Sequence, residues 1–174
     1  ECDVDVAAKD AQAWWFAYCS RERNRYDEGL SHARVVVREG ANENVVATVK
    51  NMPRPFLRRE FVTIQVCASD DNNDDLLFAG ESVDESVDYG TNFKAVRGTA
   101  RTFVKLQTVS PDACRLTVFQ IVDAGGRVPA WVLNMKVAVA LGGMEEIRQA
   151  FDRSDEVDKV ALDELVGVIE HEQQ

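Results

Sequence analysis

Residues 123–151 of the chain read DAGGRVPAWVLNMKVAVALGGMEEIRQAF, and this stretch decides the fold that the sequence predicts. It begins with Gly125 and Gly126, which take positive φ angles without steric cost and therefore suit a turn. Pro129 follows at a place where the first turn of a helix tolerates proline. Residues 131–141 are apolar on nearly every side, and a helix of about 23 residues would span roughly 35 Å. A helix this apolar needs other elements packed around it.

The part of the chain before this helix predicts an antiparallel sheet. Segments rich in β-branched or alternating residues, separated by short turns, are typical of strands joined by hairpins. The expected strands are residues 32–38, 44–50, 60–68, 76–87, 95–108 and 114–122, with a shorter one at residues 4–6. In residues 95–108, Val104 and Leu106 occupy even positions and Arg101 and Lys105 occupy odd positions. This alternation predicts a strand with one buried face and one solvent-exposed face. The predicted fold class is α+β, with a curved antiparallel β-sheet wrapped around a long C-terminal α-helix.

Two further helices are predicted outside this sheet. The first covers residues 11–26, where Trp14, Trp15 and Tyr18 lie on one side. A helix packed against the sheet is the simpler interpretation, and an aromatic ligand site is the alternative. The second helix follows Asp155 and carries an apolar seam. We expect residues 1–152 to form one domain and residues 153–174 to form a C-terminal helical extension.

Composition and charge restrict the class of protein. Of the 174 residues, 45% are hydrophobic and 29% are charged, as in ordinary globular domains. The formal net charge of −10 argues against nucleic acid as a partner, because phosphate binding needs a basic face. No apolar run approaches the ~18 residues that a membrane span needs, and the sequence shows no signal peptide.

Cysteine and histidine usage predicts neither disulfides nor a metal site. The four cysteines are widely spaced without a C-x-x-C pair, and the chain has only two histidines. Buried, reduced thiols are the simpler interpretation, which favours an intracellular, cytoplasmic location. The acidic run at residues 69–75 lacks the glycine and the terminal glutamate of an EF-hand loop, so a solvated hairpin tip is expected. We therefore expect no metal and no cofactor.

Three motifs occur along the chain in a characteristic order. They are RREFV at residues 58–62, AVRG at residues 95–98 and IVDAGGRVPAWVLN at residues 121–134. They resemble, respectively, the Arg-Asp-Phe-Val strand entry, the Val-Arg-Ala strand entry and the Asp-x-Gly-Gly-x-(Ile/Leu/Val)-Pro-x-Trp junction of the StAR-related lipid-transfer (START) family. The matched positions are Arg59, Glu60, Phe61, Val62, Ala95, Val96, Arg97, Gly98, Asp123, Gly125, Gly126, Pro129, Trp131 and Asn134. The resemblance covers about residues 4–152.

This resemblance implies a helix-grip fold with an internal apolar cavity between the sheet and the long helix. Sterol-binding members carry an arginine inside the cavity at the place of Gln65, and an acidic residue near Val46 or Ala47, so the resemblance does not extend to a sterol ligand. The family is usually longer at its N-terminus. Because the chain also starts with Glu1 rather than Met, we expect neighbouring domains in a longer chain.

The resemblance also implies which side chains contact a ligand. Aligned with the family, Phe61, Thr63, Gln65 and Cys67 form the cavity face of one strand. Together with residues of the later elements, the expected ligand-binding set is Phe61, Thr63, Gln65, Cys67, Val104, Phe119, Trp131, Leu133, Val137 and Leu141. The four residues of this strand carry an amide but no charge, which favours a ligand with one neutral polar group at the deep end. The alternative is that these residues simply fill a core.

The function predicted from these observations is the binding of a lipid or other hydrophobic small molecule, for transfer or for ligand-dependent regulation within a larger protein. Alternatives are a helix-grip enzyme of the cyclase or hydrolase type and a protein-interaction module with a filled core. The sequence offers no Ser-His-acid set, so we expect no catalytic residue and no enzyme. Glu60 and Glu81 are expected to be solvated or paired with an arginine such as Arg59.

The proline-rich loop at residues 51–58 carries the expected membrane contact. It combines Phe56 with Arg54 and Arg58 in an otherwise acidic protein. The ring would insert transiently while the arginines meet anionic headgroups. A solvated loop without any membrane role is the alternative.

Overall fold

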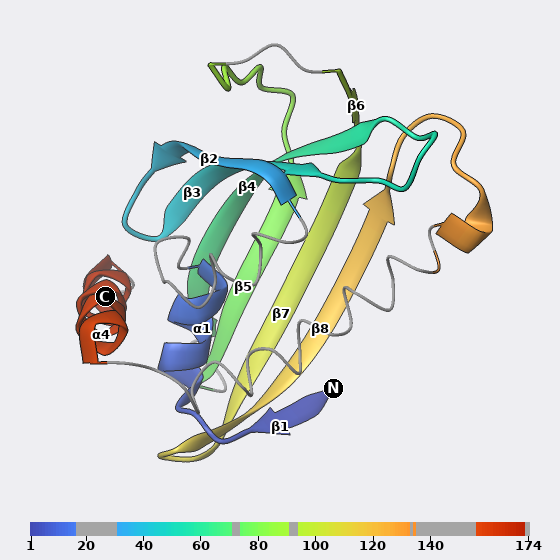
Figure 1. Cartoon of the computed structure of the whole chain (residues 1–174). Coiled ribbons are helices and arrows are strands. Elements are labelled where there is room, and N and C mark those ends of the chain that lie inside the picture. Colours follow the sequence, from blue (N-terminus) through green and yellow to red (C-terminus); the bar gives the residue numbers. More distant parts are fainter. Residues whose placement is uncertain (17–30, 71–73, 91–93, 133, 135–155, 173–174) are drawn as a thin grey trace.

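A computed structural model describes residues 1–16, 31–70, 74–90, 94–132, 134 and 156–172 of the chain (Figure 1). Most of the predicted long helix, residues 131–151, lies outside the described residues, and so does most of the predicted helix at residues 11–26. Residues 130–132 and 134 are helical, as the position of Pro129 predicts.

The described elements form one large antiparallel sheet with two helices. In chain order they are β1 (Cys2–Val4), α1 (Ala8–Phe16), β2 (Ser31–Glu39), β3 (Glu43–Lys50), β4 (Arg58–Asp70), β5 (Asp75–Ser82), β6 (Ala95–Arg97), β7 (Thr99–Ser110), β8 (Ala113–Asp123) and α4 (Glu156–Glu172). The strand order is β1-β8-β7-β5-β4-β3-β2, and the short β6 pairs in parallel with β4. Most neighbours in this order are also neighbours in sequence, as expected for hairpin connections.

Several strand boundaries differ from the prediction, and those of β4, β5 and β6–β7 matter for the site. β4 begins at Arg58, two residues before the predicted start, and β5 ends at Ser82 rather than at Val87. The predicted strand at residues 95–108 is two strands, β6 and β7, separated by Gly98. A Cβ atom at Gly98 would lie 2.5 Å from Cε1 of Phe61 and 2.8 Å from the carbonyl oxygen of Asp123. Only glycine permits this close approach, which interrupts the strand.

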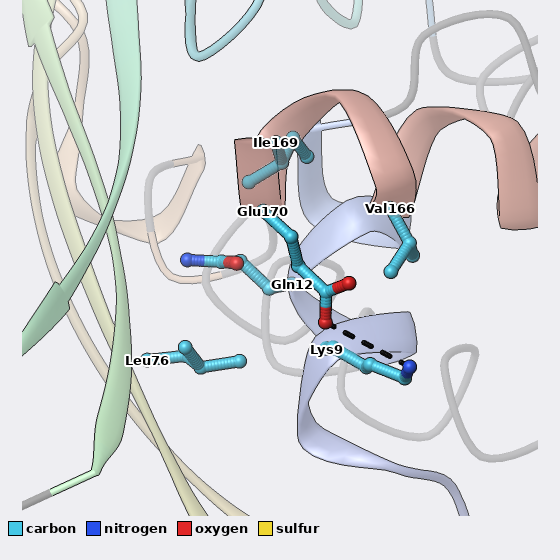
Figure 2. A pocket seen from close by; sticks show the side chains of 6 residues that line it. All are labelled: Lys9, Gln12, Leu76, Val166, Ile169 and Glu170. Atoms are coloured by element: carbon cyan, nitrogen blue, oxygen red, sulfur yellow. Dashed lines mark ion pairs between the residues drawn. The ribbon is translucent and has the colours of Figure 1, made fainter. Parts of the chain in front are cut away.

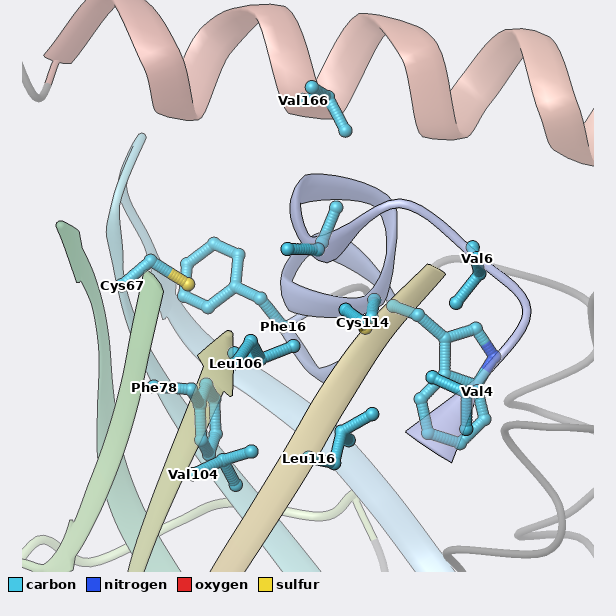
Figure 3. Close-up of a cluster of buried hydrophobic side chains, with 14 of the residues drawn as sticks. Val4, Val6, Phe16, Cys67, Phe78, Val104, Leu106, Cys114, Leu116 and Val166 are labelled. Atoms are coloured by element: carbon cyan, nitrogen blue, oxygen red, sulfur yellow. The ribbon is translucent and has the colours of Figure 1, made fainter. Parts of the chain in front are cut away.

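The sheet has an inner face, on which α1 packs, and an outer face on the opposite side. Because side chains alternate along a strand, the register decides which residues share a face. One row across β4, β5, β7 and β8 consists of Cys67, Phe78, Val104 and Val118. The first three are buried in the main apolar cluster together with α1, so this row belongs to the inner face (Figure 3).

The helix α4 packs against α1 and joins the same apolar cluster. Val166 and Ile169 of α4 are buried there, and Lys9 of α1 lies 3.7 Å from Glu170 (Figure 2). A cavity of about 30 Å³ lies between the two helices and Leu76 of β5. This volume holds about one water molecule and no lipid.

Candidate functional site

The three sequence motifs meet at one end of the sheet. The amide of Gly98 donates a hydrogen bond to the carbonyl oxygen of Glu60 at 2.8 Å, which joins the second motif to the first. Gly125, from the third motif, lies against the second, because a Cβ atom there would sit 2.3 Å from the carbonyl oxygen of Arg97. Segments separated by more than 60 residues therefore form one structural unit.

The turn after β8 sets the direction in which the chain leaves the sheet. The amide of Gly125 donates to Oδ1 of Asp123 at 2.8 Å. Gly125 and Gly126 have positive φ angles of 66° and 65°. The amide of Val132 then donates to the carbonyl oxygen of Pro129 at 3.0 Å and begins the helix. The motif thus reverses the chain at the sheet edge and starts the helical segment that follows.

Glu60 joins the motifs on the outer face of the sheet. Its carboxylate lies 3.0 Å from Nε of Arg97 and accepts a hydrogen bond of 2.7 Å from the hydroxyl of Tyr89. Burial, and next the bond to Glu60, raise the pKa of Tyr89. Arg97 also donates to the carbonyl oxygen of Glu85 at 2.7 Å, which ties residues 83–90 to the sheet.

Glu60 pairs with an arginine, as expected, but the partner is Arg97 and not Arg59. Neighbouring residues of a strand point to opposite faces, so the side chains of Glu60 and Arg59 are separated by the sheet. Glu81 also pairs with an arginine, since Nε of Arg101 donates to its carboxylate at 2.7 Å. Both acidic residues therefore form ion pairs on the outer face, away from the predicted ligand.

The structure brings five predicted ligand-binding residues to the inner face: Phe61, Thr63, Gln65, Cys67 and Val104. Gln65 is 8% exposed, and its Nε2 donates to Oγ1 of Thr63 at 3.3 Å. That hydroxyl lies 3.5 Å from the carbonyl oxygen of Val46, to which it donates. The inner face of β4 thus combines apolar side chains with one buried amide.

Two other members of the predicted ligand-binding set, Phe119 and Trp131, do not lie on the inner face with these five. Phe119 pairs with Phe103, so it lies on the outer face and is 64% exposed. Alternation along β8 assigns the inner face to Val118, which is why Phe119 does not join the predicted set there. Trp131 is 58% exposed, whereas Val132 is buried. The last three predicted residues, Leu133, Val137 and Leu141, lie outside the described residues.

Asn44 is an inner-face residue that sequence reasoning missed. It lies directly opposite Gln65 in the register of β3 and β4 and is 5% exposed. Its Oδ1 atom is buried and accepts no hydrogen bond within the described part of the chain. An asparagine in an otherwise valine-rich strand was a signal, but only the register shows that it faces Gln65.

Arg59 is the second residue that was missed at this face. The predicted strand began after it, whereas β4 includes it and places it two residues from Phe61 on the same face. Its side chain is 4% exposed and donates from Nη1 to the carbonyl oxygens of Leu57 and Arg58. The inner face of β4 therefore carries a charge, contrary to the prediction of a neutral strand.

The loop before β4 has the composition expected for a surface contact. Arg54 and Leu57 are exposed, while Phe56 and Arg58 are half-buried. The amide of Phe56 donates to the carbonyl oxygen of Pro53 at 3.0 Å, which closes a turn. Leu57 is thus more accessible than the predicted Phe56.

The described residues carry little chemistry that could serve catalysis. Cys2, Cys67 and Cys114 form no disulfide, and burial raises the pKa of both Cys67 and Cys114 to about 12. Such thiols stay protonated near neutral pH and are poor nucleophiles. Among the described residues, no three His, Cys, Asp or Glu side chains cluster closely enough to hold a metal ion. None of the described helices is long and apolar enough to span a membrane.

The large, open antiparallel sheet and its packing define an α+β protein of the helix-grip class. A family model described as the START domain matches residues 11–154, so the chain belongs to the START domain family. A comparison with curated protein sequences finds no significant match.

Solved structures of START proteins share this fold. Human STARD10 aligns with a TM-score of 0.72 and 22% identity, over 99% of this chain and 69% of that chain. The lipid transfer and protein localization domain of human StarD13 (DLC2) aligns with a TM-score of 0.66 and 16% identity, over 86% and 74%. A STAR-related lipid transfer protein from Xanthomonas axonopodis aligns with a TM-score of 0.66 and 17% identity, over 87% of this chain and 82% of that chain.

Proposed function

We propose that this START domain binds a lipid or another small hydrophobic molecule against the inner face of its sheet, for transfer or for ligand-dependent regulation within a larger protein. The observation that carries the proposal is a pair of buried amides, Asn44 and Gln65, opposite each other on the inner face, which also carries the apolar side chains of the main cluster. An apolar surface with a few convergent polar groups suits a small hydrophobic ligand. Two of the structural relatives are named for lipid transfer, which agrees with this function.

The amide pair indicates the chemistry of the deep end of the ligand. A buried polar atom without a hydrogen bond costs about 1–3 kcal/mol, and Oδ1 of Asn44 is such an atom within the described residues. A ligand hydroxyl or amide that donates a hydrogen bond to Oδ1 of Asn44 would satisfy this atom. We therefore propose a neutral polar group at this position and an apolar body around it.

Native mass spectrometry of the purified chain tests the function directly. A co-purified lipid supports binding, and a domain without any bound molecule indicates an interaction module with a filled core. We assign no catalytic role to the site, and no enzymatic step is needed for this function.

Substitution of Gln65 tests the position of the ligand. Gln65→Leu should weaken the binding of a long-chain fatty acid with a hydroxyl at the far end of its chain by about 1–3 kcal/mol, because that hydroxyl then loses its partner in a buried site. The affinity is measured by fluorescence titration below the critical micelle concentration. The matched control is Gln107→Leu, the same change on the outer face of β7, which should leave the affinity unchanged. Equal affinities for the wild type and Gln65→Leu would show that Gln65 does not contact the ligand.

A further inference from the structure

Arg59 is a buried cation on the inner face of the sheet. Its register partners are Lys50 on β3 and Val96 on β6, and neither can neutralise it. None of the described carboxylates forms an ion pair with its guanidinium. A charge moved from water into a protein interior is very costly unless it is paired, so buried arginines normally have an anionic partner.

The guanidinium is held by one of its nitrogens. Nη1 donates to the carbonyl oxygens of Leu57 and Arg58, which fixes the plane of the group at the end of the loop. Nε is buried and donates to no acceptor among the described residues, nor is a hydrogen bond from Nη2 found there. These two nitrogens form the edge of the guanidinium that presents two parallel N–H groups. This is the edge that binds a carboxylate or a phosphate in bidentate fashion.

We propose that Arg59 binds the anionic group of the ligand that occupies the inner face. This inference rests on the proposed function and specifies the ligand as an acidic amphiphile, with a phosphate or carboxylate at the loop end of β4. Six residues separate Arg59 from Gln65, which corresponds to about 20 Å along a strand. The apolar body of the ligand therefore extends from Arg59 toward the amide pair.

A pair of matched lipids tests this assignment. Fluorescent lysophosphatidic acid and the monoacylglycerol with the same acyl chain differ only in the phosphate. The wild type should bind the phosphate-bearing lipid about 10- to 100-fold more tightly, the range expected for a charge-assisted bidentate contact. Arg59→Gln should abolish this preference, so that the ratio of the two affinities falls to about one. The control Arg101→Gln, which removes a cation from the outer face, should retain the preference.

The outcomes separate this inference from the proposed function. Equal binding of both lipids by the wild type overturns the role of Arg59 and leaves lipid binding intact. If neither lipid binds, both proposals fail. If Arg59→Gln does not fold, as judged by circular dichroism, the comparison of the two lipids with the wild type still tests the role of Arg59. Arg59→Lys keeps the charge but loses the planar guanidinium, so it should retain only part of the preference.

Free phosphate could bind to the same guanidinium as a lipid phosphate. Millimolar inorganic phosphate is therefore added to the titration with lysophosphatidic acid. Competition that disappears in Arg59→Gln shows that the site accepts free phosphate, whereas a retained preference without competition assigns it to the lipid headgroup. Both results support an anion site at Arg59, and they distinguish free phosphate from a lipid headgroup as the bound anion.

Discussion

Gly125 and Gly126 have nearly the same backbone conformation but different surroundings. Their φ angles are 66° and 65°, a region that residues with a side chain rarely adopt. A Cβ atom at Gly125 would sit 2.3 Å from the carbonyl oxygen of Arg97, whereas at Gly126 its nearest neighbour would be a methyl group of Val96 at 3.9 Å. The two glycines therefore separate the cost of backbone conformation from the cost of a steric clash.

Gly125→Ala should lower the free energy of unfolding by clearly more than Gly126→Ala. Both substitutions add strain of about 1–3 kcal/mol from the positive φ. Only the change at Gly125 also forces the turn away from β6, because the nearest neighbour is a backbone carbonyl group and cannot rotate away. Urea denaturation of both variants and of the wild type measures the difference. Equal losses would show that the contact between the second and third motifs does not constrain the turn.

At the scale of the elements, the connection between β3 and β4 is the part most suited to a membrane. It exposes Arg54 and Leu57 and leaves Phe56 and Arg58 half-buried. Basic residues next to an anionic bilayer contribute about 1 kcal/mol each. We propose that this loop touches the membrane transiently while the ligand enters or leaves the inner face.

Charge reversal tests the loop. The double variant Arg54→Glu, Arg58→Glu should bind vesicles of phosphatidylserine and phosphatidylcholine at low salt at least about 30-fold more weakly, since two attractions of about 1 kcal/mol are lost. Co-sedimentation measures the bound fraction. The charge-matched control is Arg38→Glu, Arg101→Glu, with both changes at exposed positions away from the loop. A similar loss in both double variants would indicate a general charge effect and not a contact made by this loop.

At the scale of the whole molecule, α4 belongs to the same packing unit as the sheet. The family match ends at residue 154, before α4 begins, yet Val166 and Ile169 are buried in the main apolar cluster. The cluster also contains α1 and the inner-face residues of β7 and β8. We therefore expect the domain and the C-terminal extension to unfold together.

Ile169→Ala should destabilise the whole domain by about 2–5 kcal/mol, the usual cost of removing a large buried aliphatic side chain. The fluorescence of Trp14 and Trp15 on α1, followed in urea, reports the transition of the domain itself. The neighbouring Val168 is about half-exposed, so Val168→Ala should change the midpoint very little. If Ile169→Ala left the tryptophan transition in place, α4 would be an independent appendage.

Sequence reasoning identified the strands, the three motifs and the family because these depend on local patterns. Alternation within residues 95–108 correctly separated Val104 from Arg101, since a strand has a period of two wherever it lies. The motif around Gly125 was recognisable because glycine and proline are required by the local backbone.

Only the tertiary structure decided which residues share the inner face. Alternation shows that a strand has two sides, but the register between strands decides which sides coincide, and a shift of one residue exchanges them. Phe119 was therefore included in the ligand-binding set although it lies on the outer face, and Asn44 was not connected with Gln65. The start of β4 at Arg58 could not be predicted either, because a run of two arginines has no apolar pattern. Its position in the sheet comes from pairing with β3 and β6, and this pairing buries Arg59 on the face where the ligand is proposed to bind.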